Sequence, residues 1–110
     1  LIILCLGGND FLQHQGESET VANLRAMLDQ ARSAQIPLLL LAPPAPSLPL
    51  RVPPFYAELA REFSVPLEAE ALPEILAHGR LKSDTIHPNA AGYRQLAEAL
   101  AARLKSAGAV

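Results

Sequence analysis

Two uninterrupted apolar runs constrain the fold of this chain more than any other feature of its sequence. Residues 1–6 (LIILCL) are followed at once by the turn residues GGND, and residues 38–42 (LLLLA) are followed by two prolines. Short apolar runs that end at turn residues are typical of strands buried on both faces. Such strands belong to parallel sheets that helices cover on both sides.

Helical patterns occupy much of the remaining sequence. Residues 20–34 carry apolar side chains three and four positions apart, as on one face of a helix, and residues 65–67 are a possible short third strand. Further helices are predicted at residues 54–63, 71–79 and 90–105. The core-facing positions expected in the last helix are Tyr93, Leu96, Ala97, Leu100 and Leu104. The order of elements predicts that residues 1–110 belong to a single domain with a three-layer α/β/α, flavodoxin-like fold and a parallel sheet.

Composition excludes several classes of function. The 110 residues carry a net charge of −2 and no basic cluster to hold a phosphate backbone, so nucleic acid is not an expected partner. No apolar run reaches the roughly 20 residues needed to span a membrane. The three histidines lack metal-ligand spacing, so no metal is expected. Cys5 is the only cysteine, which excludes an intrachain disulfide, and its apolar run predicts that it is buried.

The polar and unusual segments of the chain are expected to meet at one edge of this sheet. Ligand sites in such folds form beyond the carboxyl ends of the strands. The turn at residues 7–10 follows the first strand, and residues 43–54, which hold six of the ten prolines, follow the second. Residues 82–89 precede the last helix and are expected to lie on the same rim.

One motif at this edge, D-T-I-H-P-N at residues 84–89, suits acid–base chemistry. An imidazole such as that of His87 acts as a general base near neutral pH, and it works best when a carboxylate holds its other nitrogen. Asp84, three residues earlier in a tight turn, is placed to do this, and Pro88 favours an extended backbone at His87. The alternative is that Asp84 only shapes the turn and that His87 is a surface residue.

A second motif, G-G-N-D at residues 7–10, suits the stabilisation of a negatively charged oxygen. The side-chain amide of Asn9 is a neutral donor of the kind that binds the oxyanion of a tetrahedral intermediate. The glycines let a substrate approach the backbone closely. The alternative is a simple turn, since these residue types all favour turns. Phosphate binding is not expected, because the motif has neither G-x-G-x-x-G spacing nor a P-loop lysine.

Together, a strand ending in G-G-N-D, a later D-x-x-H-P-N loop and a helix beginning A-A-G-Y resemble the SGNH/GDSL hydrolase family. The likeness is greatest to its small bacterial thioesterases, lysophospholipases and arylesterases, and it covers essentially the whole chain. The resemblance implies that Asn9 is the oxyanion-hole donor, that His87 is the catalytic base and that Asp84 orients His87. The residues assigned to substrate binding are Gly8, Phe11, Leu12, Pro44 and Ile86.

The resemblance also implies an activity. Enzymes of this family hydrolyse small or fatty acyl esters or thioesters through an acyl-serine intermediate, and they need no cofactor. A periplasmic or secreted location is favoured by the resemblance, while the residues themselves give no information on it.

The chain departs from the family pattern at its N-terminal side. The family's G-D-S-L segment, which carries the nucleophilic serine, and its glycine segment have no counterpart here. None of the serines stands in a G-D-S setting after a strand: Ser18, Ser33, Ser47, Ser64, Ser83 and Ser106. We therefore predict that the chain is the C-terminal part of an SGNH hydrolase domain and that it is inactive alone.

The missing segments also predict an exposed sheet edge. Residues 1–6 would present an unpaired apolar strand, and such edges pair with other chains or aggregate. We expect a companion N-terminal segment or a partner strand to cover them. Two alternatives stay open, a non-catalytic interaction module derived from the SGNH fold and a flavodoxin-like regulatory or binding domain. The second explains the alternating elements but not the D-x-x-H-P-N loop.

Overall fold

A parallel sheet of three strands forms the centre of the molecule. The computed structural model describes residues 1–7, 16–45 and 49–108. Within them the strands β1 (Ile2–Leu4), β2 (Leu38–Leu41) and β3 (Leu67–Glu68) lie in the order β1-β2-β3. Ile3 is in register with Leu39, and Leu40 with Leu67. The predicted parallel sheet is thereby confirmed.

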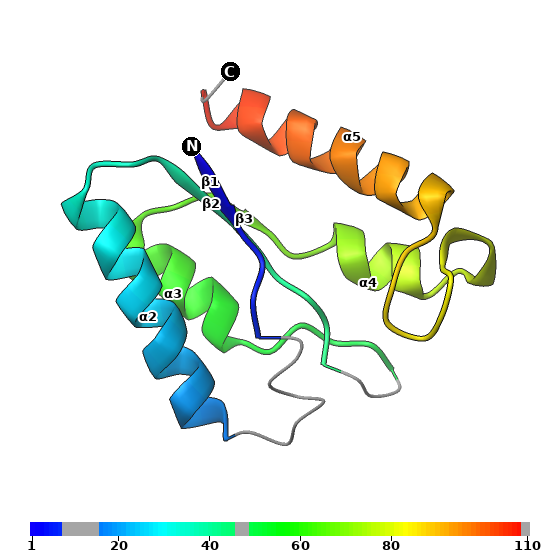
Figure 1. Cartoon of the computed structure of the whole chain (residues 1–110), viewed down its shortest axis with the longest axis horizontal. Helices are drawn as coiled ribbons and strands as arrows, with labels where there is room; N and C mark the ends of the chain where they lie inside the picture. The colour runs from blue at the N-terminus through cyan, green and yellow to red at the C-terminus, as the bar shows by residue number, and fades with distance from the viewer. Residues whose placement is uncertain (8–15, 46–48, 109–110) are drawn as a thin grey trace.

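Helices cover both faces of this sheet, as the apolar runs predicted. On one face α2 (Glu17–Ser33) and α3 (Phe55–Phe63) pack against Leu38 and Leu40. On the other face α4 (Ala71–Leu76), the short 3₁₀ helix η1 (Gly79–Leu81) and α5 (Ala90–Ser106) pack with Leu39 and Leu41. Figure 1 shows the pair α2 and α3 on one side of the strands and the pair α4 and α5 on the other. All four residues of β2 are buried, because β2 is the central strand.

Several boundaries differ from those predicted. The first helix begins at Glu17 rather than at residue 20, because its first turn is solvent-facing and therefore polar apart from the buried Thr20. The third strand lies at residues 67–68. The predicted helix 71–79 ends at Leu76, and a separate 3₁₀ turn follows because the backbone of His78 is extended.

The buried face of α5 also differs from the prediction. Tyr93 and Ala97 were expected in the core, but both are exposed, Tyr93 to 52%. The helix instead packs through Gly92 and Leu96, and a Cβ atom at Gly92 would overlap the carbonyl oxygen of Leu81. This close approach of backbone to backbone sets the rotation of α5 about its own axis and turns Tyr93 outward.

The strand β1 lies at one edge of the sheet and is only partly covered. Ile2 and Leu4 pack against the α2 and α3 side, whereas Ile3 points to the opposite face and is 44% exposed. Leu1 and Leu6 are also exposed, and Cys5, which was expected to be buried, is exposed as well. The reason is that α5 covers β2 and β3 but leaves the β1 edge open.

Candidate active site

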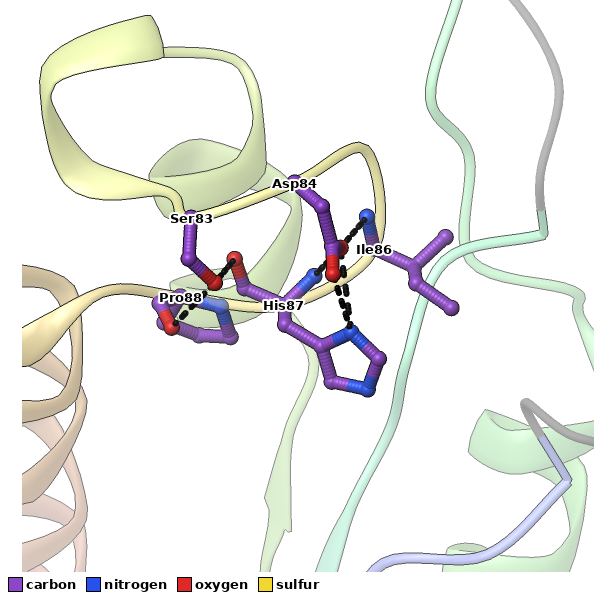
Figure 2. A network of polar contacts seen from close by, with 5 residues as sticks. All are labelled: Ser83, Asp84, Ile86, His87 and Pro88. Carbon is purple, nitrogen blue, oxygen red and sulfur yellow. Dashed lines mark hydrogen bonds and ion pairs between the residues drawn. The ribbon is translucent and has the colours of Figure 1, made fainter.

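The loop between η1 and α5 joins Asp84 and His87 in one compact turn. The Oδ1 atom of Asp84 accepts hydrogen bonds from the backbone N–H groups of Ile86 and His87, each at 2.9 Å. The His87 ring lies beside the same carboxylate, with Nδ1 at 3.0 Å from Oδ1 and 2.9 Å from Oδ2. Figure 2 shows both sets of contacts converging on this carboxylate. One acidic group therefore holds both the turn and the ring.

This arrangement fixes the chemistry of the imidazole. A carboxylate cannot donate, so the contact with neutral His87 is made by a proton on Nδ1. The lone pair then belongs to Nε2, which points away from Asp84 in Figure 2. Both side chains are 57% exposed, so Nε2 is accessible to a reactant. The pair has the geometry of a general base and the acid that orients it.

Hydrogen bonds hold the pKa of the Asp84 carboxyl below its ordinary value. The largest cause is the backbone N–H of Ile86, followed by the hydrogen bond with the His87 ring. Both interactions favour the charged carboxylate over the neutral acid. Asp84 is therefore ionised at neutral pH, as the orienting role requires.

The lowered pKa predicts how the loop responds to acid. A carboxyl whose pKa is lower in the folded state stabilises the fold above its unfolded pKa of about 3.9, and this stability is lost as pH falls through the folded pKa. In a His87→Ala variant the pKa of Asp84 should rise but stay below the ordinary value, because the Ile86 N–H remains. Carbon-13 NMR titration of the carboxyl measures this, and an ordinary pKa in the unaltered protein would contradict it.

Backbone hydrogen bonds close the base of the same loop. Ser83 N–H donates to the carbonyl of His87, and Asn89 N–H donates to the carbonyl of Leu81, both at 2.9 Å. The Asn89 side chain accepts from the Gly92 N–H at 3.0 Å, which caps α5, and donates to the Arg80 carbonyl at 2.8 Å. The segment carrying Asp84 and His87 is therefore tied to η1 and α5 at both of its ends.

Replacing Asn89 by alanine is expected to lower the free energy of unfolding by about 1–2 kcal/mol, because both the helix cap and the bond to the Arg80 carbonyl are lost. Asn23, exposed in the middle of α2, provides the matched control. Its replacement by alanine should change stability by less than about 0.5 kcal/mol. Urea unfolding measures both, and equal effects would remove the structural role given to Asn89.

The structure describes only two of the other predicted site residues. Gly8, Asn9, Phe11 and Leu12 lie outside the described residues. Gly7, the last described residue before them, follows β1, is buried and has a φ of +111°.

Pro44 and Ile86 are described and lie at the carboxyl end of the sheet. Pro44 is buried just after β2, and Ile86 is half-buried. Figures 1 and 2 both place the 82–89 loop beside the segment that leaves β2, and Ile86 extends toward that segment. The structure thus brings two of the predicted loops to the same end of the molecule.

One cavity of about 410 Å³ opens elsewhere, at the amino ends of the strands. Its lining includes Leu1, Pro37, Leu38, Phe63 and Leu104. Asp84 and His87 take no part in it, so it is not the acyl pocket that the sequence placed beside them.

Tyr56 is a polar residue near the carboxyl end of β1, and the sequence gave no reason to single it out. It lies in the first turn of α3, is fully buried, and donates a hydrogen bond from its hydroxyl to the carbonyl of Leu6 at 2.7 Å. The only sequence signal was a hydroxyl-bearing residue on an otherwise apolar helix face. Its partner lies 50 residues away and could not be identified from spacing.

The described segments contain no group of three or more His, Cys, Asp or Glu residues placed to hold a metal ion. Among the same residues, no helix is both long and apolar enough to cross a bilayer.

A model of the GDSL-like lipase/acylhydrolase family matches residues 1–95. The crystal structure of TesA is similar, with a TM-score of 0.76 and 27% identity, over 96% of this chain and 62% of that one. AlinE4, an SGNH-hydrolase family esterase, is similar with a TM-score of 0.57 and 27% identity, over 96% and 59%.

A third similarity shows the fold alone. The psychrotrophic esterase EstA from Pseudoalteromonas sp. has a TM-score of 0.70 at 18% identity, over 94% of this chain and 60% of that one. No curated protein sequence matches the chain. The chain spans less than two thirds of each of these solved structures.

Proposed function

Because this chain belongs to the GDSL-like lipase/acylhydrolase family, we propose that it supplies the acid–base pair and one oxyanion donor of a serine ester hydrolase. The observation that carries the proposal is the Asp84 carboxylate, which holds both the turn backbone and the Nδ1 atom of His87. An aspartate that only formed the turn would not need the contact with the His87 ring. The nucleophilic serine comes from a segment outside these 110 residues, and the two together are called the complete hydrolase below.

The reaction follows from the roles of these groups. Nε2 of His87 takes the proton of the serine hydroxyl as the serine oxygen attacks the acyl carbonyl carbon. The side-chain amide of Asn9 donates to the oxygen that becomes negatively charged. The protonated His87 then gives its proton to the leaving alcohol or thiol, which leaves an acyl-serine. Water, deprotonated by His87, attacks that ester and releases the acid, while Asp84 keeps the ring in one orientation throughout.

The substrate class is an ester or thioester of a small or fatty acyl group. Gly8, Phe11, Leu12, Pro44 and Ile86 are proposed to contact the acyl group, and no cofactor takes part in the reaction. Support for two of them comes from the fold, since Pro44 and Ile86 lie in the two loops that meet beyond the carboxyl end of β2. Both side chains are apolar, as an acyl pocket requires.

We also propose that a companion segment or partner strand covers the free edge of β1. Support comes from the exposure of Ile3 (44%) in β1 and of Leu1 (59%) and Leu6 (44%) on either side of it. In a parallel pair alternate residues bond to the neighbour, so the backbone N–H and C=O of Ile3 point away from β2 and are available to another strand.

The open edge predicts the behaviour of the 110 residues when they are expressed alone. Exposed apolar strands associate, so we expect oligomers or aggregates rather than a single species. Sedimentation velocity measures this directly. A monodisperse monomer of 11.8 kDa would show that β1 needs no further strand.

Hydrolysis assays test the proposed function. The complete hydrolase should turn over p-nitrophenyl esters or acyl thioesters, and His87→Ala should lower kcat by about 10⁴-fold or more. His78, an exposed histidine after α4, is the control, and His78→Ala should leave kcat unchanged. Turnover that survives His87→Ala would refute the assignment. No turnover on any ester, with a stable complex between the chain and a strand partner, would favour the interaction module instead.

A further inference from the structure

The buried hydroxyl of Tyr56 is placed where the chain leaves β1. Pairing with β2 ends at Leu4, so the backbone of residues 5–7 has no strand partner in the described part of the sheet. The Tyr56 hydroxyl donates to the carbonyl of Leu6 at 2.7 Å. This side-chain bond holds the backbone at a position where the hydrogen bonds between β1 and β2 have ended. A buried hydroxyl is costly unless it is hydrogen-bonded, so this contact constrains the Leu6 backbone closely.

The helix that carries Tyr56 is a rigid support. Phe55, Leu59, Ala60 and Phe63 of α3 are all buried against the sheet, and the Phe55 ring lies 4.4 Å from the Tyr56 ring between centroids. In Figure 1 α3 lies beside the segment that leaves β1. The position of the hydroxyl is therefore set by the packing of a whole helix, and not by a surface side chain free to change rotamer.

Gly7 shows that the backbone turns directly against this hydroxyl. Its φ of +111° is a conformation that side chains other than glycine rarely adopt, and a Cβ atom at Gly7 would overlap the Tyr56 hydroxyl oxygen. Asn9 follows Gly7 two residues later in the sequence. Tyr56 thus bonds to the Leu6 backbone and closes the space beside Gly7.

We propose that Tyr56 is a positioning residue: it fixes the backbone of Leu6 and Gly7, from which the segment carrying Asn9 continues. This inference rests on the proposed function, because it requires Asn9 to be the oxyanion donor. Such a donor acts only when it lies about 2.7–3.1 Å from the developing negative charge, and a displacement of about 1 Å can cost 10²-fold in rate. Tyr56 touches no substrate atom and acts on the rate only through Asn9.

Tyr56→Phe in the complete hydrolase is the first test. The variant keeps the ring and its packing but loses the bond to the Leu6 carbonyl. We expect kcat to fall about 10-fold while KM changes by less than about twofold, because the interaction lost acts in the transition state. The other tyrosine of the chain, Tyr93, is exposed on α5 and provides the matched control. Tyr93→Phe should leave both constants unchanged.

A double-mutant cycle with Asn9→Ala separates positioning from a general structural effect. Asn9→Ala alone should lower kcat by about 10²–10³-fold. If Tyr56 acts through Asn9, adding Tyr56→Phe to that variant should lower kcat by less than about twofold further, because coupled residues are not additive. A further 10-fold loss in the double variant would show that Tyr56 acts on the fold in general and would overturn the proposal.

The remaining outcomes distinguish this inference from the function on which it rests. A large effect of Asn9→Ala with no effect of Tyr56→Phe would refute the role of Tyr56 and leave the proposed function intact. No effect of Asn9→Ala would refute the oxyanion assignment, and the role of Tyr56 would fall with it. If Tyr93→Phe lowered kcat as much as Tyr56→Phe, that result would also count against the proposal.

Discussion

Asp84→Asn in the complete hydrolase is expected to lower kcat by about 10⁴-fold, the size of effect that the loss of the orienting carboxylate has in triad hydrolases. The asparagine oxygen can still accept from the backbone N–H groups of Ile86 and His87, so the turn is retained. Its NH₂ group then faces Nδ1 of His87 and donates to it. The ring must carry its proton on Nε2, which leaves no lone pair to accept the serine proton.

Asp29 provides the control for this change. It is an exposed aspartate of α2 that pairs only locally with Arg32, at 2.7 Å, in the contacts described. Asp29→Asn should leave kcat within about twofold, because surface pairs of this kind contribute little. If Asp84→Asn were as mild as Asp29→Asn, the carboxylate would be a turn residue only, and the acid–base pair would be wrong.

Gly92→Ala is expected to lower the free energy of unfolding by about 3 kcal/mol. The new Cβ atom would overlap the carbonyl oxygen of Leu81 and crowd Pro88 and Ile75. Backbone atoms cannot move aside as a side chain can, so α5 must shift. That shift would also displace the 82–89 loop, since Pro88 and Asn89 lead directly into the helix.

Gly79→Ala is the matched control for this prediction. Gly79 lies in η1, and a Cβ atom there would meet no atom within 4 Å. Its replacement should change stability by less than about 1 kcal/mol. Chemical unfolding of the complete hydrolase measures both variants. Equal stability of the two would show that the close packing at Gly92 does not fix the position of α5.

The sheet and its helices could be predicted because the relevant signals are local. The run at residues 38–42 is apolar throughout since β2 is covered on both faces, and the structure buries every residue of that strand. The run at residues 1–6 has the same character, but only Ile2–Leu4 pair as a strand, because among the described strands β1 has a neighbour on one side only. The apolar pattern alone does not distinguish an edge strand of this kind from a central one, and the exposed edge was expected only from the family resemblance.

The parts that sequence did not predict depend on contacts between distant residues. The rotation of α5 follows from the approach of Gly92 to the carbonyl of Leu81. Glu68 is charged yet 5% exposed in β3, because its carboxylate accepts from the N–H groups of Glu70 and Ala71 where α4 begins. Neither contact changes the periodicity of the sequence, so neither could be inferred from it.

The candidate site shows the same division. Asp84 and His87 are three residues apart in one turn, and their contact was predictable from that spacing. The bond between Tyr56 and Leu6 spans 50 residues and was not. The assignment of Asn9 to the oxyanion and the source of the serine stay predictions that activity measurements must test.

Fluorophosphonate labelling of the native complete hydrolase, followed by mass analysis of its peptides, tests the central claim most directly. The reagent forms an adduct only with a serine that a neighbouring base has activated. We predict one adduct on a serine outside residues 1–110, which is lost in His87→Ala and retained in His78→Ala. An adduct on one of the six serines of this chain, or labelling that does not depend on His87, would contradict the account.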